Sequence, residues 1–239
     1  MYFLLSGEGP TDLGVCPNGL AICEGEQHSQ GPLAIIMSQI AEQQIMYSFI
    51  DTHSYGFISK GELKQKASEL KKKKSLRLPG KKKQKETEYY YRNARSLALF
   101  AKEKQEELND DDVIAVLFRD SDGSASADRG HWQHKRDSMI KGFQDENFEK
   151  GVPMVPKPKS EAWIICAVKN NPYQGCGSLE NRSGNDNSPQ SLKKEIAEIL
   201  KGQTSRTQLC ELVNNGTIDW NRIEMPSFLA FKNALIDVL

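Results

Sequence analysis

The stretch "VIAVLFRDSDG" (Val113–Gly123) decides the fold. It opens with six apolar residues, Val113–Phe118, half of them β-branched, and then ends on two aspartates, Asp120 and Asp122. A continuous apolar run of this length is typical of a strand that is buried on both faces, as in a parallel sheet. Ligands of such sheets gather beyond the carboxyl ends of the strands. Polar side chains that directly follow a strand are therefore the first candidates for a functional site.

The rest of the chain predicts an α/β fold, in which a small, mainly parallel sheet is flanked by helices. Apolar spacing near 3.6 residues indicates the helices, and short apolar runs indicate the strands. The prolines of the last predicted strand indicate that it lies at a sheet edge or ends quickly, and Ser160 is expected to be the N-cap of the helix that follows. The predicted strands are 2–6, 57–58, 113–118 and 152–158, and the predicted helices are 31–50, 87–108, 128–148, 160–169, 189–201, 204–213 and 226–239.

Two units are predicted. Residues 1–169 would form the catalytic domain, with a basic helical insertion at about 59–95. Residues 170–239 would form a loop rich in Gly, Asn and Ser and a helical extension that packs on the domain.

Charge is strongly segregated along the chain. The net charge is zero over 239 residues, but Ser59–Arg95 contains 14 Lys and Arg against four acidic residues, so the remainder is acidic. Lysines neutralise phosphates, and the neighbouring Tyr89–Tyr91 offers rings that can stack on bases. We therefore expect a nucleic-acid interface here. The alternatives are a solvated lysine tract and a surface that binds an acidic protein. The predicted contacts are Lys71, Lys72, Lys73, Lys74, Arg77, Lys81, Lys82, Lys83, Arg92 and Arg95.

Five scattered cysteines lack the spacing of a zinc site. We interpret them as reduced thiols and expect a cytoplasmic protein. The apolar run at the start of the chain is only about four residues long, and no stretch approaches the roughly 20 apolar residues of a membrane span, so neither a signal peptide nor a membrane partner is expected.

Acidic side chains follow two of the predicted strands. Glu8 and Asp12, in "EGPTD", come after the first strand, and a helix that begins near Pro10 would place them on one face. In an extended segment Asp120 and Asp122 point the same way. If the two strands are neighbours, about 4.8 Å apart, the carboxylates that follow them lie close together. The electrostatic repulsion between two such charges at 4 Å is about 4 kcal/mol.

Such a cluster predicts one or two Mg²⁺ or Mn²⁺ ions. The alternative for Asp120 and Asp122 is an Asx-turn or a helix cap. The alternative for Asp12 is an acid at a helix N-terminus.

The pair of motifs "EGPTD" and "DSDG" resembles the TOPRIM domain, and is closest to small OLD-family-like TOPRIM nucleases of bacterial anti-phage systems. The resemblance covers about residues 1–169 and implies Mg²⁺-dependent phosphoryl-transfer chemistry on nucleic acids. It implies that Glu8 is the general base or a metal-bridging acid and that Asp120 and Asp122 hold Mg²⁺. Asp12 would help to bind a second metal. The chain departs from the family in the span of more than 100 residues between its motifs.

A second polar cluster, "PKPKSEAW", follows the last predicted strand. Its prolines hold the backbone extended, so Lys157 and Lys159 point to one side. One of them is predicted to stabilise charge on the phosphate in the transition state, which matches the order of motifs in OLD-like nucleases. Glu161 is either a further metal ligand or an acid in the first turn of the next helix.

The sequence therefore predicts a metal-dependent nuclease that cleaves DNA or RNA. By the resemblance, it would be the effector of an anti-phage system and work with a separate ATPase or sensor protein, since the chain has no GxxxxGK[ST] motif of its own. The alternatives are primase-like nucleotidyl transfer and a non-catalytic scaffold that bridges protein and DNA. Homo-oligomerisation stays open.

Overall fold

The computed structural model describes residues 1–73, 85–121 and 130–239. Within them, the central sheet has five strands in the order β3-β5-β1-β6-β7. Strands β5, β1, β6 and β7 run parallel to their neighbours, and only β3 is antiparallel. A small antiparallel pair, β2 with β4, lies apart from this sheet. The strands are β1 (Tyr2–Ser6), β2 (Gly14–Val15), β3 (Ile22–Glu24), β4 (Ser29–Gln30), β5 (Tyr55–Ile58), β6 (Val113–Phe118) and β7 (Gly151–Met154).

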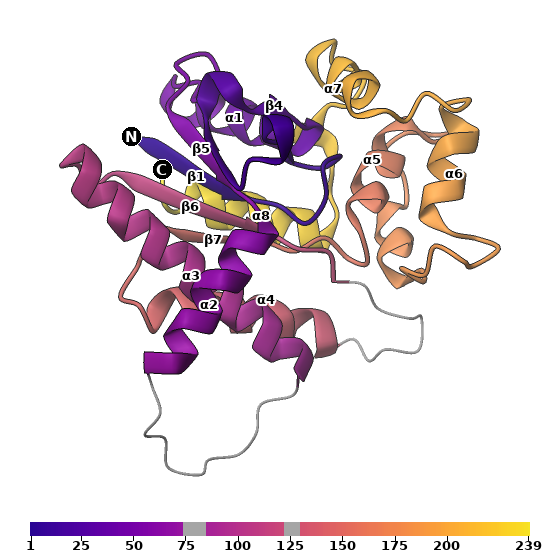
Figure 1. The fold of residues 1–239 in the computed structure, drawn as a ribbon. Helices are drawn as coiled ribbons and strands as arrows, with labels where there is room; N and C mark the ends of the chain where they lie inside the picture. Colours follow the sequence, from indigo (N-terminus) through magenta and orange to yellow (C-terminus); the bar gives the residue numbers. More distant parts are fainter. Residues whose placement is uncertain (74–84, 122–129) are drawn as a thin grey trace.

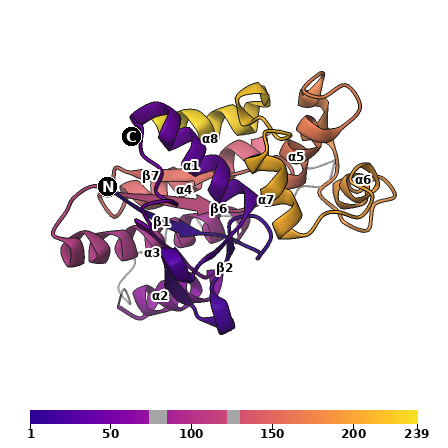
Figure 2. The same ribbon diagram turned by 90° about the horizontal axis from the view of Figure 1, so that it is seen from above.

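Helices cover both faces of the sheet. In Figures 1 and 2, α2, α3 and α4 lie on one face, α1 and α8 lie on the other, and α5, α6 and α7 lie beyond the carboxyl ends of the parallel strands. The α-helices are α1 (Pro32–Ile45), α2 (Lys60–Lys73), α3 (Lys85–Leu108), α4 (Gly130–Gln144), α5 (Ser160–Val168), α6 (Leu192–Ile199), α7 (Arg206–Asn214) and α8 (Pro226–Ile236). The 3-10 helices are η1 (Pro17–Gly19), η2 (Gly25–Gln27), η3 (Cys176–Asn181) and η4 (Trp220–Arg222).

The central strands explain why their sequences are apolar without alternation. In β6, Ile114 and Val116 face the core under α1, α5 and α8, whereas Ala115 and Leu117 face the core under α3 and α4. Successive side chains of a strand point to opposite faces. Because both faces are covered, every position of β6 is buried.

The predicted architecture is confirmed at its coarse level: the fold is α/β, with a mostly parallel sheet between helices. Strand 113–118 has the predicted bounds, and β7 lies at the sheet edge, as its prolines indicated. The helix predicted over 31–50 ends at Ile45, because Met46 adopts a left-handed conformation with φ of 55°. The part of the predicted basic insertion at 74–84 lies outside the described residues.

Two details at the helix ends were predicted wrongly. No helix begins near Pro10; residues 10–13 form a turn instead. Ser160 is the first residue of α5 rather than its N-cap, which is Lys159. The Ser160 side chain is therefore available for a contact outside its own helix.

The C-terminal helix α8 packs into the core beside α5. The Trp163 ring lies 5.1 Å from the Phe228 ring and 6.0 Å from the Phe231 ring, measured between centroids, and its Nε1 donates to the Ser227 hydroxyl at 2.8 Å. Residues after 169 thus complete the hydrophobic core on this side of the sheet. The boundary between two units at residue 169 stays a prediction.

The expectation of reduced cysteines is wrong in this structure. Disulfides join Cys16 to Cys23 and Cys166 to Cys176, and Cys210 alone takes no part in one. The spacing of the cysteines matches no metal-binding motif, but it does not exclude disulfide pairing, because pairing depends on how the turns between the cysteines fold. Disulfides are typical of oxidising compartments, so the cytoplasmic location stays a prediction that these bonds disfavour.

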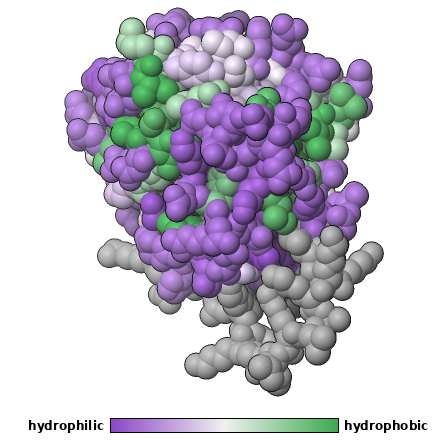
Figure 3. All heavy atoms as spheres, turned by 90° about the vertical axis from the view of Figure 1, so that its left-hand side faces the viewer, coloured by the Kyte–Doolittle hydropathy of each residue, from purple (hydrophilic) through white to green (hydrophobic). Residues whose placement is uncertain are grey.

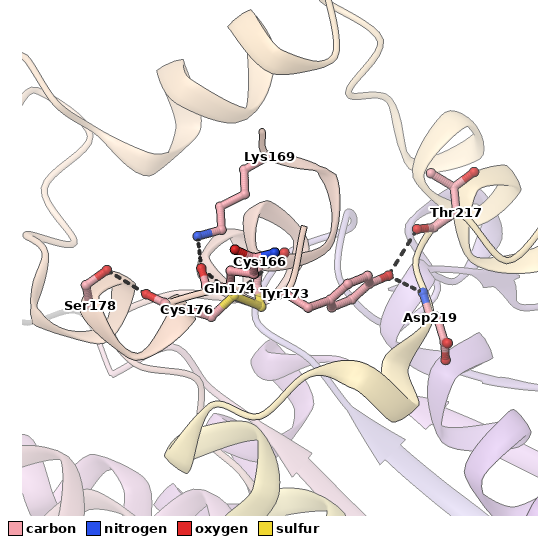
Figure 4. Close-up of a disulfide and its surroundings, with 9 residues drawn as sticks. Cys166, Lys169, Tyr173, Gln174, Cys176, Ser178, Thr217 and Asp219 are labelled. Atoms are coloured by element: carbon pink, nitrogen blue, oxygen red, sulfur yellow. Dashed lines mark hydrogen bonds between the residues drawn. A yellow bond between two sulfur atoms is a disulfide. The ribbon is translucent and has the colours of Figure 1, made fainter. Parts of the chain in front are cut away.

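The second disulfide fastens the end of α5 to the following loop. Figure 4 shows Cys166 and Cys176 joined beside Tyr173. The Tyr173 hydroxyl donates to the Thr217 carbonyl at 3.2 Å and accepts from the Asp219 N–H at 2.9 Å. This network ties the 170–181 segment both to α5 and to the chain that leads into α8.

Hydrophilic side chains dominate the face of the molecule that Figure 3 shows, and hydrophobic atoms appear there only as smaller areas between them. Among the helices described, none has the length and apolarity needed to cross a membrane.

His28 is a buried titratable side chain without polar partners. It is 4% exposed, its ring stacks on Phe57 at 4.8 Å between centroids, and neither ring nitrogen has a hydrogen-bond partner among the described residues. Burial, with a smaller effect of the Arg206 charge, lowers the pKa of His28 to about 4. The folded protein therefore holds this imidazole neutral.

We predict that His28 makes the fold sensitive to acid. Between pH 6.5 and pH 4 the unfolded chain binds a proton that the folded protein does not, so stability falls as the pH falls, by about 3 kcal/mol in total. The variant His28→Phe keeps the stacking and lacks the titration. Chemical denaturation of both proteins from pH 8 to pH 4 should give curves that diverge below pH 6.5. Parallel curves would contradict the burial of a neutral ring.

We predict that the Cys166–Cys176 disulfide stabilises the fold. Closing a loop of about ten residues contributes on the order of 2–3 kcal/mol. The double variant Cys166→Ser/Cys176→Ser should lose that amount in chemical denaturation, whereas Cys210→Ser should lose little. Mass spectrometry of alkylated, non-reduced peptides from the wild type should recover the linked pair. Alkylation of both cysteines without reduction would show that the bond does not form.

Candidate functional site

Glu8 and Asp120 meet at the carboxyl ends of the two central strands. Strands β1 and β6 are parallel neighbours, with Ser6 opposite Leu117. Glu8 follows β1 by two residues and Asp120 follows β6 by two residues. The Glu8 Oε2 atom accepts from the Asp120 backbone N–H at 3.2 Å. The two strands are neighbours, and the Glu8 carboxylate contacts the Asp120 backbone; that the two acids share an ion stays a prediction.

Ser160 joins two more groups of the cluster. Its backbone N–H, in the first turn of α5, donates to Asp120 Oδ1 at 3.1 Å, and its hydroxyl donates to Asp12 Oδ1. Two carboxylates thus meet at the N-terminus of α5, where the helix dipole favours negative charge, and Glu8 joins them through the Asp120 backbone. The alternative interpretation of Asp120 as a helix cap holds to this extent, because Asp120 caps α5 from a distant strand.

The turn that carries Asp12 is fixed to the start of α1. The Asp12 carbonyl accepts from the Leu33 N–H at 3.0 Å, and the Gly31 N–H donates to the Leu13 carbonyl at 2.9 Å. A Cβ atom on Gly31 would lie 2.2 Å from the Asp12 carbonyl oxygen. Only glycine permits this close approach, which sets the position of the Asp12 side chain.

Glu8 is held in its charged form. Its Oε1 accepts from Lys60 Nζ at 2.6 Å and from the Tyr89 hydroxyl at 3.1 Å. Burial alone would raise the pKa of Glu8, but Lys60, Arg119 and Tyr89 together hold that pKa below its ordinary value. The Lys60 ammonium therefore supplies a positive charge beside this acid.

Arg119 contributes a second, permanent positive charge beneath the cluster. The side chain is fully buried and donates to the carbonyls of Ser6 and Phe118 and to the Asn93 side chain at 2.8 Å. It forms no ion pair with a carboxylate of the described chain. The guanidinium thus acts on Glu8 through space and through its neighbouring ring, Tyr89.

Asp12 has the opposite balance. Burial raises its pKa to about 6, the negative charges of Glu161 and Glu8 add to the rise, and the hydrogen bond from Ser160 only partly offsets it. Perturbed carboxyl groups in a cleft are typical of functional sites. Asp12 is therefore the position in the cluster where an added cation would relieve the most unfavourable charge.

A cavity of about 170 Å³ opens beside the cluster. Asp12, Asp120, Ser160 and Glu161 are among the residues that line it. Glu161 therefore faces the same space as the acids without being placed as a ligand. Asp122, the fourth predicted acid, lies outside the described residues.

The described carboxylates do not form a ready-made metal site. No group of three or more His, Cys, Asp and Glu side chains lies within reach of one ion in residues 1–73, 85–121 and 130–239. Oxygen donors nevertheless suit a hard divalent cation. Glu8, Asp12 and Asp120 could hold such an ion only if Glu8 exchanged its contact with Lys60 for the metal.

The two predicted lysines lie beside the cluster. Ser121, just after Asp120, donates through its N–H to the carbonyls of Pro156 and Pro158, at 3.2 and 3.0 Å. This pairing brings the "PKPKS" segment to the end of β6. Lys159 Nζ lies 2.9 Å from Asp186 Oδ1, with only 14% of its side chain exposed, whereas Lys157 is half-buried.

Two of the predicted nucleic-acid contacts form ion pairs within the chain, and the side chains of the others are not described. Arg95 is buried in an ion pair with Glu146, which disagrees with a role in binding phosphate, and Arg92 pairs with Glu88. Lys71, Lys72 and Lys73 belong to α2, but their side chains are not described, and Lys74, Arg77, Lys81, Lys82 and Lys83 lie outside the described residues.

The tyrosines are also placed differently from the prediction. Tyr90 and Tyr91 are buried, so they cannot stack on bases. Tyr89 instead donates to Glu8.

Four residues of the site had not been assigned to it from the sequence: Lys60, Tyr89, Ser160 and Arg119. Lys60 and Tyr89 stood inside the basic segment, where an intramolecular partner could not be distinguished from a nucleic-acid contact. Ser160 was noticed, but as a cap for its own helix. Arg119 adjoins Asp120 in the sequence, which was the one available signal.

Comparison of the chain with protein-family models, with curated proteins and with solved structures found no match.

We predict that Asp12 lowers stability at neutral pH. An unfolded aspartate loses its proton near pH 4, whereas the folded Asp12 keeps its proton until about pH 6. Stability is therefore lost as the pH rises through this interval, by on the order of 2–3 kcal/mol. In a buffer that contains a chelator, the free energy of unfolding of Asp12→Asn should exceed that of the wild type by that amount at pH 7 and equal it at pH 4. A variant that is less stable at pH 7 would contradict the raised pKa.

Proposed function

We propose that this protein is a metal-dependent phosphodiesterase that cleaves DNA or RNA. One observation carries the proposal: Ser160 hydrogen-bonds both Asp12 and Asp120 beside a cavity, while Glu8 accepts from the Asp120 backbone, so acids that follow two parallel strands are linked at the start of α5. The resemblance of "EGPTD" and "DSDG" to TOPRIM motifs supports the same chemistry.

Glu8, Asp12 and Asp120 are the residues that would hold Mg²⁺ or Mn²⁺, with Asp122 and Glu161 as further candidates. Their carboxylate oxygens match the preference of these ions, and the raised pKa of Asp12 indicates excess negative charge. When bound, such an ion polarises the phosphate and makes water a stronger acid.

The other groups of the chain would bind and orient the substrate. Lys159 is the described cation nearest the start of α5, and it would offer its ammonium to a phosphate oxygen after release from Asp186. Lys157 precedes it by two residues. The positive end of the α5 dipole would favour the phosphate charge.

The reaction proposed is hydrolysis. A water oxygen forms a bond to phosphorus, and the bond from phosphorus to the leaving alcohol oxygen breaks. The water loses one proton, and the leaving oxygen gains one. Glu8, which the fold holds ionised, is the group proposed to accept the proton.

Nucleic acid is proposed as the substrate class because the segment from Ser59 to Arg95 is strongly basic. Its described part includes Lys60 beside the acid cluster and the exposed Lys64 on α2. An ATPase or sensor partner, a role in anti-phage defence and a cytoplasmic location are the further proposals that follow from the resemblance.

We predict metal-dependent cleavage that requires both strand-end acids. Labelled single-stranded DNA, duplex DNA and RNA are incubated with Mg²⁺ or Mn²⁺. Asp120→Asn and Glu8→Gln should each reduce the rate by about 100-fold or more. Asp51→Asn, at an exposed turn far from the cluster, should cleave like the wild type. Circular dichroism of each variant separates loss of catalysis from loss of folding.

Other outcomes of the same assay identify the alternatives. Extension of a primer when nucleotides are added would indicate primase-like nucleotidyl transfer. Binding of nucleic acid with no turnover in either metal would indicate a scaffold. Cleavage that persists in both acid variants would show that the nuclease site lies elsewhere.

A further inference from the structure

The cavity beside the acid cluster is a recess with aliphatic as well as acidic walls. Its aliphatic walls are formed by Leu33 of α1, Ile164 of α5, Ile196 of α6 and Leu209 of α7. All four side chains are at most 5% exposed. Three helices that lie beyond the strand ends in Figure 1, together with the start of α1, thus enclose a space that the carboxylates alone do not require.

The lining of the cavity is mixed. Asp12, Asp120 and Glu161 contribute carboxylates, and the four aliphatic side chains contribute apolar surface. The lining also includes Lys193, which is exposed, and Thr204, which is half-buried. A ligand that fits this lining carries both an uncharged ring and a phosphate, drawn to a bound cation.

The volume limits the ring to one. An apolar cavity of about 150 Å³ is large enough to bind benzene, and this cavity measures about 170 Å³. It therefore has room for a single nucleobase and not for a stacked pair. A base inside a duplex is flanked by neighbours on both sides and would have to leave the stack to enter.

We infer that this cavity binds the nucleoside next to the scissile phosphate, with its base on the aliphatic walls, so that the enzyme acts on an unpaired nucleotide. This inference rests on the proposed function, since it takes the acid cluster as the place where the phosphate reacts. It adds a substrate class: single strands, frayed ends or flaps, rather than the interior of a stable duplex.

Small chromogenic esters test the cavity separately from the chemistry. The p-nitrophenyl ester of thymidine monophosphate carries one nucleoside, whereas methyl p-nitrophenyl phosphate carries none. With Mn²⁺, the wild type should hydrolyse the nucleoside ester with a kcat/KM at least about tenfold higher, which is the size of effect expected for one base. Thr204→Trp places a large side chain in the lining of the cavity and should abolish this preference while leaving the methyl ester unaffected.

The matched control is Thr207→Trp, which introduces the same side chain three residues further along the chain, at an exposed position of α7 that does not line the cavity. It should retain the preference. Ile196→Phe, which fills the recess from within, replaces Thr204→Trp if circular dichroism shows that the latter does not fold.

The outcomes separate the two proposals. Equal hydrolysis of both esters by the wild type, or an equal loss on both in Thr204→Trp, would overturn the nucleoside pocket and leave the phosphodiesterase standing. Hydrolysis of neither ester would overturn the phosphodiesterase. Calorimetric titration with thymidine monophosphate and Mg²⁺ would then still decide the pocket: binding at least about tenfold weaker in Thr204→Trp than in Thr207→Trp supports it, and equal or absent binding overturns it.

Discussion

The parallel pairing of β1 with β6 is the constraint on which the site depends. The register that sets Ser6 opposite Leu117 brings the carboxyl ends of the two strands side by side. Glu8 and Asp120 then lie within one hydrogen bond of each other, although 112 positions separate them in the chain. Because both faces of these strands are buried, a shift of register would place their side chains against the wrong core. The packing that fixes the strands therefore also fixes the acids.

The negative charges of the acid cluster are compensated unequally. Glu8 has Lys60, Tyr89 and the buried Arg119 around it, so it stays ionised. Asp12 accepts from the Ser160 hydroxyl, and the negative charges of Glu161 and Glu8 add to the rise of its pKa that burial causes. The fold thus favours the charged form of Glu8 and the protonated form of Asp12. A cation bound between them would act mainly on Asp12.

The sequence predicted the scaffold better than the contacts. The apolar run of 113–118 and the polar residues that follow it were sufficient to place strand β6 and to expect Asp120 at a sheet edge with Glu8. The contacts that join the acids depend on geometry that no spacing encodes. Ser160 contacts Asp12 because α5 begins one residue earlier than expected, and Lys60 reaches Glu8 because α2 starts beside β1. Both disulfides likewise follow from turns that bring distant sulfurs together.

Arg119 has a consequence for how such a site can be lost during evolution. A guanidinium stays protonated at any pH at which a protein is folded, and here it lies in the core with carbonyls and an amide as its neighbours. Replacing Glu8 by a neutral residue would remove the nearby negative charge and leave this cation less compensated. A lineage that abandoned the site would therefore gain from replacing both residues, so a descendant with an apolar residue at 119 and a neutral one at 8 would be the expected form of a degenerate copy.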